Sequence, residues 1–372
     1  MLPPNAFPIA RQMFQRLPGL WAPGMDLHLR HHHRNRAPTR LDVMTSFAGR
    51  SLDAVQVMVL SLAETHPQDH TRLWLFEQDI PDSEIRAFGT FCASLGNVEL
   101  RPLRVPDAAS FSQLKELGGK PDSARFLWFV AHELLPDDLS RVIYLDAADI
   151  IVADDLAPLL THPFLGKYLI ACREFNDLPP LLIGNARRAH RCGVPAGVIR
   201  MVSRGLINSG AIVVNLDRLR RERIGIAHYL QTAEWASTRL NLRFGDQGLF
   251  SLTHGSHYTR LHDRYNHRFW AEPVGRMMRD PAVLHYAGRI VKPANWQLST
   301  TQEAMVLDHL HRSGSDALKL NKHLALRAAH LPYLRRWWDT CARTPGHARL
   351  APEAARRMTA TLARLEIGTP ER

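Results

Sequence analysis

The feature that most constrains the fold is a regular alternation of short apolar runs and helix-period segments between residues 41 and 146. The apolar runs have the length of strands, and the segments between them place apolar residues every three to four positions, as a helix with one buried face does. This alternation predicts an α/β fold with a mostly parallel, doubly wound sheet and helices on both faces. The expected strands are 41–47, 72–77, 97–103 and 141–146, and the expected helices begin at Ser51 and cover 81–95 and 123–135.

The fourth expected strand ends in two acidic residues. Residues 142–145 are apolar, as in a buried central strand, and Asp146 and Asp149 follow before the apolar run resumes at 150–152. Ligands of such sheets bind beyond the carboxyl ends of the strands, and carboxylates inside an apolar run are costly unless a cation meets them. The pattern predicts a hydrated divalent metal at this strand end. A turn with two capping carboxylates is the alternative.

Composition divides the chain into three expected parts. Residues 1–40 form a basic, proline-containing arm, residues 41–296 the α/β domain, and residues 297–372 a helical, basic extension. The net charge is +11, from 47 Lys and Arg against 36 Asp and Glu. Such a charge favours anionic partners. No recognition-helix, zinc or aromatic RNA-binding motif accompanies it, so nucleic-acid binding is not expected.

Cysteine use and hydropathy predict a cytoplasmic protein. The four cysteines lie far apart without a Cys-x-x-Cys pair, which favours reduced thiols. Prolines interrupt any apolar stretch near the N-terminus, so no secretory signal is expected. No segment approaches the ~20 apolar residues of a membrane span.

Five further motifs contain polar, glycine and proline residues in a fixed order; one lies before the fourth expected strand and four lie after it. They are Glu133-Leu134-Leu135-Pro136 before the fourth strand, then Ile207-Asn208-Ser209-Gly210, Gly245-Asp246-Gln247, His285-Tyr286-Ala287-Gly288 and Lys292-Pro293. With these motifs, residues 41–296 resemble glycosyltransferase family 8, the retaining GT-A enzymes that include glycogenin and bacterial lipopolysaccharide galactosyl- and glucosyltransferases. Each motif alone is a weak signal, whereas the ordered set is specific.

The resemblance implies a divalent ion, Mn²⁺ or Mg²⁺, at the diphosphate of a nucleotide-sugar donor. The family binds this ion with an Asp-x-Asp and a histidine, and the matching metal-site residues here are Asp146, Asp149 and His285. A structural histidine after an apolar strand is the alternative for His285. Gly288 lets the backbone approach the phosphates, and Lys292 places a compact positive charge on them. Such a site stabilises the negative charge that grows on the leaving diphosphate.

The resemblance also implies which residues hold the donor sugar. The segment 208–210 matches the lining of the family's sugar pocket, with a strand-opening turn as the alternative. Asp246 and Gln247 match the pair that contacts the donor sugar and its reacting face, with a plain helix N-cap as the alternative for Asp246. The candidate catalytic residues are therefore Asp246, Gln247 and Asn208, and the candidate donor- and phosphate-binding residues are Thr45, Arg125, Ser209, Gly210, Gly288 and Lys292.

Three positions depart from the family pattern. The acids are spaced Asp-x-x-Asp, and residues three apart in a flat strand point to opposite faces, so Asp146 joins Asp149 only if the segment bulges. Ser46-Phe47 replaces the usual Asp or Asn and Tyr that contact uracil. Trp128 replaces an arginine, and Arg125, one helical turn earlier, is expected to reach the same region.

These features predict a metal-dependent, retaining transferase. It would move a hexose from a nucleoside-diphosphate sugar, in this family a UDP-sugar, to a glycan or a lipid-linked glycan. The alternative is a catalytically inactive GT-A-fold protein that binds a nucleotide or carbohydrate. The altered acid spacing and the altered base-contacting positions motivate that alternative.

The C-terminal extension has two open interpretations. Trp337 and Trp338 follow two arginines, and further arginines lie beyond them. Indole rings beside cations suit peripheral association with the anionic inner face of a membrane. In the other interpretation the tryptophans pack on the catalytic domain and the arginines form a solvated face.

Overall fold

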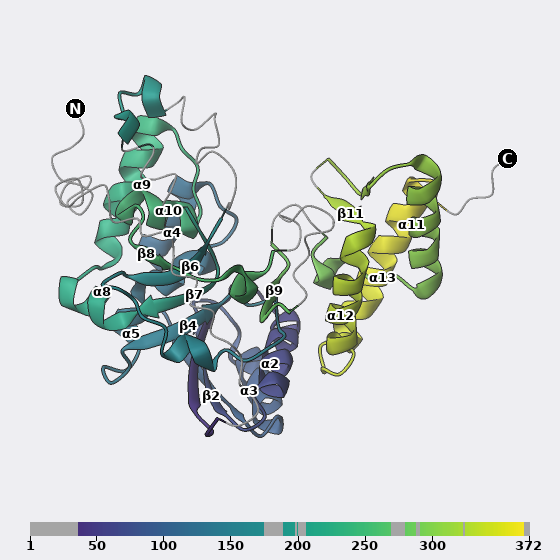
Figure 1. Cartoon of the computed structure of the whole chain (residues 1–372), viewed down its shortest axis with the longest axis horizontal. Helices are drawn as coiled ribbons and strands as arrows, with labels where there is room; N and C mark the ends of the chain where they lie inside the picture. Colours follow the sequence, from purple (N-terminus) through teal and green to yellow (C-terminus); the bar gives the residue numbers. More distant parts are fainter. Residues whose placement is uncertain are drawn as a thin grey trace.

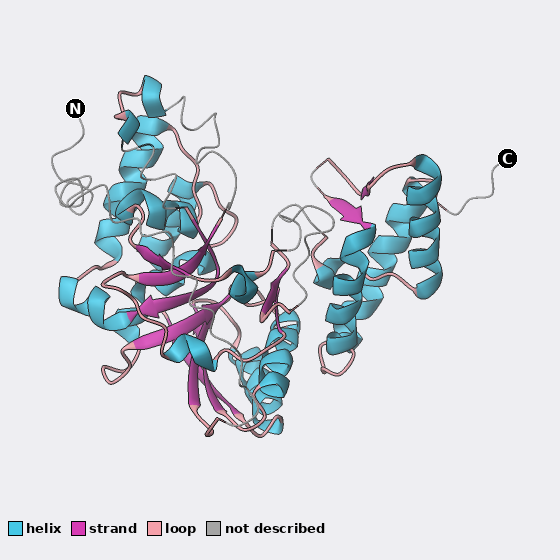
Figure 2. Cartoon of the chain, in the orientation of Figure 1, coloured by secondary structure: helices cyan, strands magenta, loops and turns pink. Residues whose placement is uncertain are grey.

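The centre of the molecule is a seven-stranded sheet with helices on both faces (Figures 1 and 2). The computed structural model describes residues 36–174, 189–197, 199, 206–268, 280–287, 291–322 and 324–367. The strand order is β3-β2-β1-β4-β7-β6-β8. Four consecutive members are parallel, namely β1 (Arg40–Ser46), β2 (His70–Glu77), β3 (Val98–Arg104) and β4 (Arg141–Leu145).

The second half of the sheet is mixed. β7 (Ile207–Asn215) runs antiparallel to β4, β6 (Leu169–Arg173) runs antiparallel to β7, and β8 (Tyr258–Arg260) runs parallel to β6. The prediction of a mostly parallel sheet with helices on both faces is confirmed. Because β7 is reversed, its amino end lies beside the carboxyl end of β4, and Leu145 pairs with Ala211.

Alternating side chains of β1 show how the sheet is covered. Val43 packs into an apolar cluster with residues of α2, whereas the next residue, Met44, packs into a second cluster with Trp128 on the other face. Successive side chains of a strand point to opposite faces, so both faces are buried. The helices over these faces are α2 (Asp53–Thr65), α3 (Asp82–Ser94), α4 (Ala108–Gly118), α5 (Ala131–Leu134), α8 (Leu216–Glu222), α9 (Ile226–Leu240) and α10 (Asp246–His254).

Two helical segments differ from the sequence prediction. The helix expected over 123–135 forms as a 3-10 helix (Ala124–Val130) that leads into the short α5. Its residues 126–130 are all buried, so packing on every side replaces the one-faced pattern of a regular helix. α4 was not expected; the side chain of Asp107 caps it by accepting a hydrogen bond from the backbone N–H of Ser110.

The two acidic residues lie in a turn between two different sheets. β4 ends at Leu145, and the chain leaves the main sheet before β5 (Ile150–Val152) begins. β5 pairs antiparallel with β9 (Val283–His285), and Ile150 lies opposite His285. The expected strand over 141–146 therefore ends one residue earlier, and the apolar runs on either side of the acids belong to separate sheets.

The C-terminal extension packs on the α/β domain (Figure 1). One apolar cluster joins Trp337 of the extension with Val57 of α2, Ile151 of β5 and Leu284 of β9. The side chain of Arg349 forms an ion pair with Asp53 at the start of α2. The extension consists of α11 (Thr300–Ser313), β10 (Ala317–Lys319), β11 (Ala325–Arg327), α12 (Leu331–Cys341) and α13 (His347–Arg364).

Burial decides between the two interpretations of the tryptophans. Trp337 is 0% exposed and Trp338 is 6% exposed, and the Trp338 indole N–H donates to the carbonyl oxygen of Trp296. Neither ring is therefore available to a membrane surface, and of the two interpretations the burial supports the one in which the tryptophans pack on the catalytic domain. Among the described residues, no helix is long and apolar enough to cross a membrane.

We expect Trp337→Ala to lower the free energy of unfolding by about 3–5 kcal/mol, because it empties a fully buried indole site shared by α12, α2 and β9. Urea unfolding followed by circular dichroism measures this change. The matched control is Arg336→Ala on the preceding, exposed position, which should stay within about 0.5 kcal/mol of the unsubstituted protein. Equal stability of the two variants would contradict a shared core.

Candidate active site

The candidate site lies where β4 ends and β7 begins. The backbone N–H of Asp146 donates to the carbonyl oxygen of Gly210 at 2.9 Å, so the acidic turn is joined to the 208–210 segment. Asp246, the first residue of α10, lies close enough to Asp146 for the two charges to interact. Three segments far apart in the sequence therefore meet at one edge of the sheet.

His285 holds the centre of this site. Its Nε2 lies 3.4 Å from Oδ2 of Asp146, and its Nδ1 lies 2.8 Å from Oδ1 of Asn266. An amide oxygen only accepts hydrogen bonds, so Nδ1 carries the proton and donates it to Asn266. With Nδ1 protonated, Nε2 donates to the Asp146 carboxylate when the ring is charged, and it offers a lone pair on that side when the ring is neutral. Such a tautomer is the one that binds a metal through Nε2.

The ring of His285 also explains why residue 210 is a glycine. A Cβ atom on Gly210 would lie 1.9 Å from Cε1 of His285 and 2.4 Å from its Nδ1. Any side chain at position 210 would therefore displace the histidine. Glycine is required here by the close approach of the imidazole rather than by a turn.

A buried chain of hydrogen bonds extends from His285 away from the acidic turn. The Nδ2 atom of Asn266 donates to Oδ1 of Asn208 at 2.9 Å, and Nδ2 of Asn208 donates to Oε2 of Glu174 at 2.6 Å. The guanidinium of Arg268 closes the chain with an ion pair to Glu174. Asn266, Glu174 and Arg268 belong to no motif, so sequence reasoning missed them.

Asp246 and Asp146 have pKa values shifted in opposite directions. Burial raises the pKa of Asp246, and the charge of Asp146 raises it further, against hydrogen bonds from Ser209 and Trp128. Burial also opposes ionisation of Asp146, but a hydrogen bond from His285, the charge of that ring when it is protonated and a hydrogen bond from Tyr144 lower the pKa of Asp146 below its usual value. Of the two carboxyl groups, that of Asp146 therefore ionises more readily.

Trp128 has a direct role beside Asp246. Its indole Nε1 donates to Oδ2 of Asp246 at 3.1 Å, and both residues are buried. The indole thus supplies a hydrogen bond at the position where the family pattern has an arginine. Arg125 lies near enough to influence the charge of Asp246, as expected from its place one turn earlier.

Asp149 and Lys292 face one another. The ammonium group of Lys292 forms an ion pair with the Asp149 carboxylate and donates to the carbonyl oxygen of Tyr286 at 2.7 Å. Asp149, which was expected to bind the metal, and Lys292, which was expected to bind the phosphates, therefore lie close together and form an ion pair with each other.

The remaining candidate residues differ in what their side chains can do. The Thr45 side chain is fully buried, and its hydroxyl donates to the carbonyl oxygen of Leu145. That hydroxyl holds β1 to β4, so only the backbone of Thr45 is left for a ligand. Gln247 is half-buried in the first turn of α10. Gly288 lies outside the described residues.

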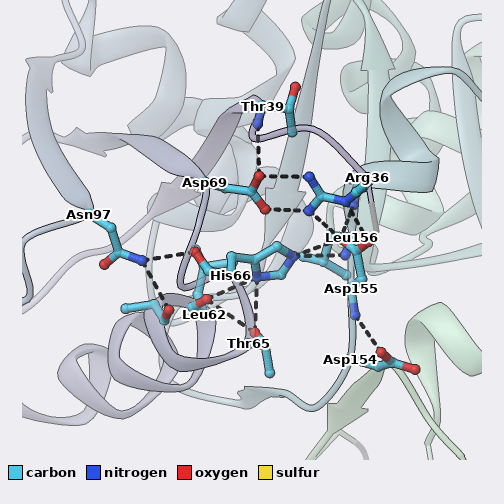
Figure 3. A network of polar contacts seen from close by, with 12 residues as sticks. Arg36, Thr39, Leu62, Thr65, His66, Asp69, Asn97, Asp154, Asp155 and Leu156 are labelled. Carbon is cyan, nitrogen blue, oxygen red and sulfur yellow. Dashed lines mark hydrogen bonds and ion pairs between the residues drawn. The ribbon is translucent and has the colours of Figure 1, made fainter. Parts of the chain in front are cut away.

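A second polar cluster lies at the opposite edge of the sheet, where β1 and β2 begin (Figure 3). His66, Asp69 and Asp155 place possible ligand atoms within 4.8 Å of one another. The guanidinium of Arg36 forms ion pairs with both carboxylates. Nε2 of His66 accepts a hydrogen bond from the backbone N–H of Leu156 at 2.9 Å, so its lone pair is already used. Arg36 thus takes the place of a metal ion and fastens the chain that enters β1.

A family model describes most of the α/β domain. The model for glycosyl transferase family 8 matches residues 39–297. The chain belongs to glycosyl transferase family 8. No curated protein matches this family 8 chain at a significant level.

Solved structures share the fold of this family 8 protein. An active-site mutant of LgtC matches with a TM-score of 0.50 and 18% identity, over 74% of this chain and 95% of LgtC. The bifunctional glycosyltransferase WbbM matches with a TM-score of 0.52 and 14% identity, over 87% of this chain and 53% of WbbM. LgtC with donor and acceptor sugar analogues matches with a TM-score of 0.48 and 19% identity, over 74% and 95% of the two chains. At such identities the likeness concerns the fold alone.

The residues of the site fit a divalent metal in part. The Nε2 atom of His285 and the carboxylate of Asp146 point to a common position, and an oxygen and an imidazole nitrogen suit Mn²⁺. Among the described residues, no third acid, histidine or cysteine completes a compact group with these two. Asp149 is the nearest candidate by sequence, and it would have to release Lys292 to join them.

We expect Gly210→Ala to cost about 1–3 kcal/mol of unfolding free energy, because the added methyl overlaps the His285 ring. In a His285→Ala background the same substitution should cost less than about 1 kcal/mol, since the overlap is gone. Urea unfolding of the four proteins gives the coupling energy. The control is Gly248→Ala, where a Cβ makes only an ordinary contact at 3.5 Å. Equal costs in both backgrounds would contradict the close approach.

We expect Trp128→Phe to move the acid limb of the pH–activity profile upward by about 1 pH unit. The substitution removes the hydrogen bond that favours ionised Asp246, so its already raised pKa rises further. Donor turnover measured between pH 4 and pH 9 tests this. Trp74→Phe is the matched control, because its indole donates to Asp42 at 2.9 Å, outside the site. An unmoved limb would mean that Asp246 does not govern it.

Proposed function

We propose that this family 8 protein is a metal-dependent, retaining hexosyltransferase. It moves a hexose from a nucleoside-diphosphate sugar, a UDP-sugar, to a glycan or lipid-linked glycan acceptor. The observation that carries this proposal is the meeting of His285, Asp146 and Asp246 where β4 ends. Ligands bind at this edge of an open α/β sheet.

Asp146 and His285 are the proposed metal-binding residues, with Asp149 as the third. Asn266 fixes the histidine tautomer, and Tyr144 donates to Oδ1 of Asp146 at 2.9 Å, so both side chains are held in place before a ligand arrives. A bound Mn²⁺ or Mg²⁺ supplies charge that stabilises a leaving diphosphate. The chain's own contribution is to orient the two ligand atoms in a partly buried site.

Lys292 is the proposed phosphate-binding residue. Its ammonium group now balances Asp149, and a nucleoside diphosphate offers it a stronger anionic partner. Exchange of Asp149 for phosphate would free the carboxylate to bind the metal. Gly288 follows His285 by three residues and is proposed to let the backbone approach the same phosphates.

Asp246, Gln247 and Asn208 are the proposed sugar-binding and catalytic residues. Asp246 accepts a hydrogen bond from Trp128 at 3.1 Å, which orients its carboxylate. Gln247 follows it in the first turn of α10, where its amide group is free of any hydrogen bond within the described part of the chain. The side chain of Asn208 is hydrogen-bonded to Glu174 and Asn266, so its orientation at the proposed sugar pocket is fixed.

The second candidate function is binding without catalysis. The ion pair between Asp149 and Lys292 favours it, since each residue satisfies the other in the ligand-free chain. Such a protein would bind a nucleoside diphosphate but would not turn over the donor. The experiment below separates the two functions.

A donor-hydrolysis screen with each UDP- and GDP-sugar, with and without Mn²⁺, tests the proposed activity. We also expect UDP with Mn²⁺ to raise thermal stability, by about 2.7 kcal/mol at a hundredfold excess over Kd. Asp146→Asn and His285→Gln should abolish both the stability shift and hydrolysis. Asp82→Asn, an exposed acid at the start of α3, is the control and should change neither.

Three other results would each contradict part of the proposed function. Nucleotide binding without hydrolysis of any donor would support the inactive relative. A full Mn²⁺-dependent shift in both variants would mean that the metal binds elsewhere. No nucleotide binding under any condition would overturn both functions.

A further inference from the structure

Three cationic side chains gather beside the first residue of α10. A Cβ atom on Gly245, directly before Asp246, would lie 3.5 Å from Cε of Lys120 and 3.8 Å from Nη1 of Arg125. A Cβ atom on Gly119 would lie 3.3 Å from Nε of Arg243. Lys120, Arg125 and Arg243 come from the loop after α4, the 3-10 helix and the segment before α10. We call these three residues the cationic cluster.

Direct ion pairs balance the cationic cluster only in part, because Asp122 pairs with Arg125 while Asp246 and Asp146 act on it at longer range. Arg125 forms an ion pair with Asp122 at 2.9 Å, but its Nε is buried and has no hydrogen-bond partner among the described residues. In the described part of the chain, Lys120 and Arg243 have no hydrogen bond or ion pair from their side chains. Burial and the nearby charge of Arg125 lower the pKa of Lys120. Like charges held this close are unfavourable without an anion.

The amino end of α10 adds positive electrostatic potential beside the cationic cluster. Its N-cap is Gly245, and no side chain caps the first backbone N–H groups. The amino end of a helix carries a partial positive charge. Asp246 also attracts Lys120 and Arg125, but its carboxylate already accepts a hydrogen bond from Trp128. The cationic cluster therefore places donors of Lys120 and Arg243, which no described side chain engages, near the amino end of α10.

We infer that the cationic cluster is a subsite for a carboxylate or phosphate group carried by the carbohydrate that binds beside Asp246. This inference rests on the proposed function and narrows its substrate class to charged sugars. The anion has two possible sources: a uronic acid on the donor, or an acidic or phosphorylated residue on the acceptor. In both cases Lys120 and Arg243 select the charged sugar over its neutral counterpart.

Calorimetry with matched charged and neutral probes tests the subsite. The donor arm compares UDP-glucuronate with UDP-glucose in the presence of Mn²⁺. The acceptor arm adds glucuronate, glucose 6-phosphate or glucose to the protein saturated with UDP and Mn²⁺. We expect about tenfold tighter binding of the charged member in one arm, as one charge-assisted hydrogen bond provides. The arm that shows the preference identifies the source of the anion.

Lys120→Gln and Arg243→Gln should each reduce that preference to less than about threefold. The matched control is Arg239→Gln, an exposed arginine four residues before Arg243 that carries the same charge change. Raising the salt concentration should weaken the preference as well, since screening shortens the range of exposed charges.

The outcomes separate this inference from the proposed function. UDP binding with no charge preference in either arm would overturn the subsite and leave the transferase proposal intact. A loss of UDP affinity in Lys120→Gln and Arg243→Gln would assign the cluster to the diphosphate and also overturn the subsite. Absence of any nucleotide binding would overturn the proposed function and this inference together.

Discussion

The contact between the His285 ring and the backbone of Gly210 sets the geometry of the whole site. The ring lies so close that no side chain fits at position 210. Each ring nitrogen also faces a different polar partner, Asn266 on one side and Asp146 on the other. One imidazole therefore fixes the distance between β9 and the main sheet and orients the acidic turn at the end of β4.

The reversed direction of β7 brings the motifs together. In an all-parallel sheet the amino end of a strand lies far from the carboxyl end of its neighbour. Because β7 runs antiparallel to β4, the 208–210 segment starts where β4 stops, and the backbone of Asp146 is bonded to Gly210. Family membership and this topology account for the site more directly than any single motif does.

The sequence predicted the parts of the fold that depend on local patterns. Apolar runs gave β1 to β4 to within two residues at each end, because parallel central strands are buried on both faces. The 3-10 helix over Ala124–Val130 escaped prediction, since burial on all sides removes the one-sided period. The separate pairing of residues 150–152 was not predictable, because the partner of β5 lies more than 130 residues away in the chain.

The candidate site was predictable only where residues stand in family motifs. Asp146, His285 and Asp246 come together as the resemblance implies, while their chemical roles remain predictions. Asn266 and Glu174 are single polar residues in segments without a motif, and only their tertiary positions reveal them. The Asp149–Lys292 ion pair was not predictable either, because it depends on the tertiary contact between two segments far apart in the sequence.

Tyr286 gives the C-terminal extension a mechanical connection to the acidic turn. Its hydroxyl donates to the carbonyl oxygen of Tyr333 in α12 at 2.7 Å, and its backbone N–H donates to the carbonyl oxygen of Asp149 at 2.8 Å. The ring between these two bonds is buried. One residue thus connects the backbone of α12 with the backbone of the acidic turn, so a substitution that shifts α12 acts on the turn through Tyr286.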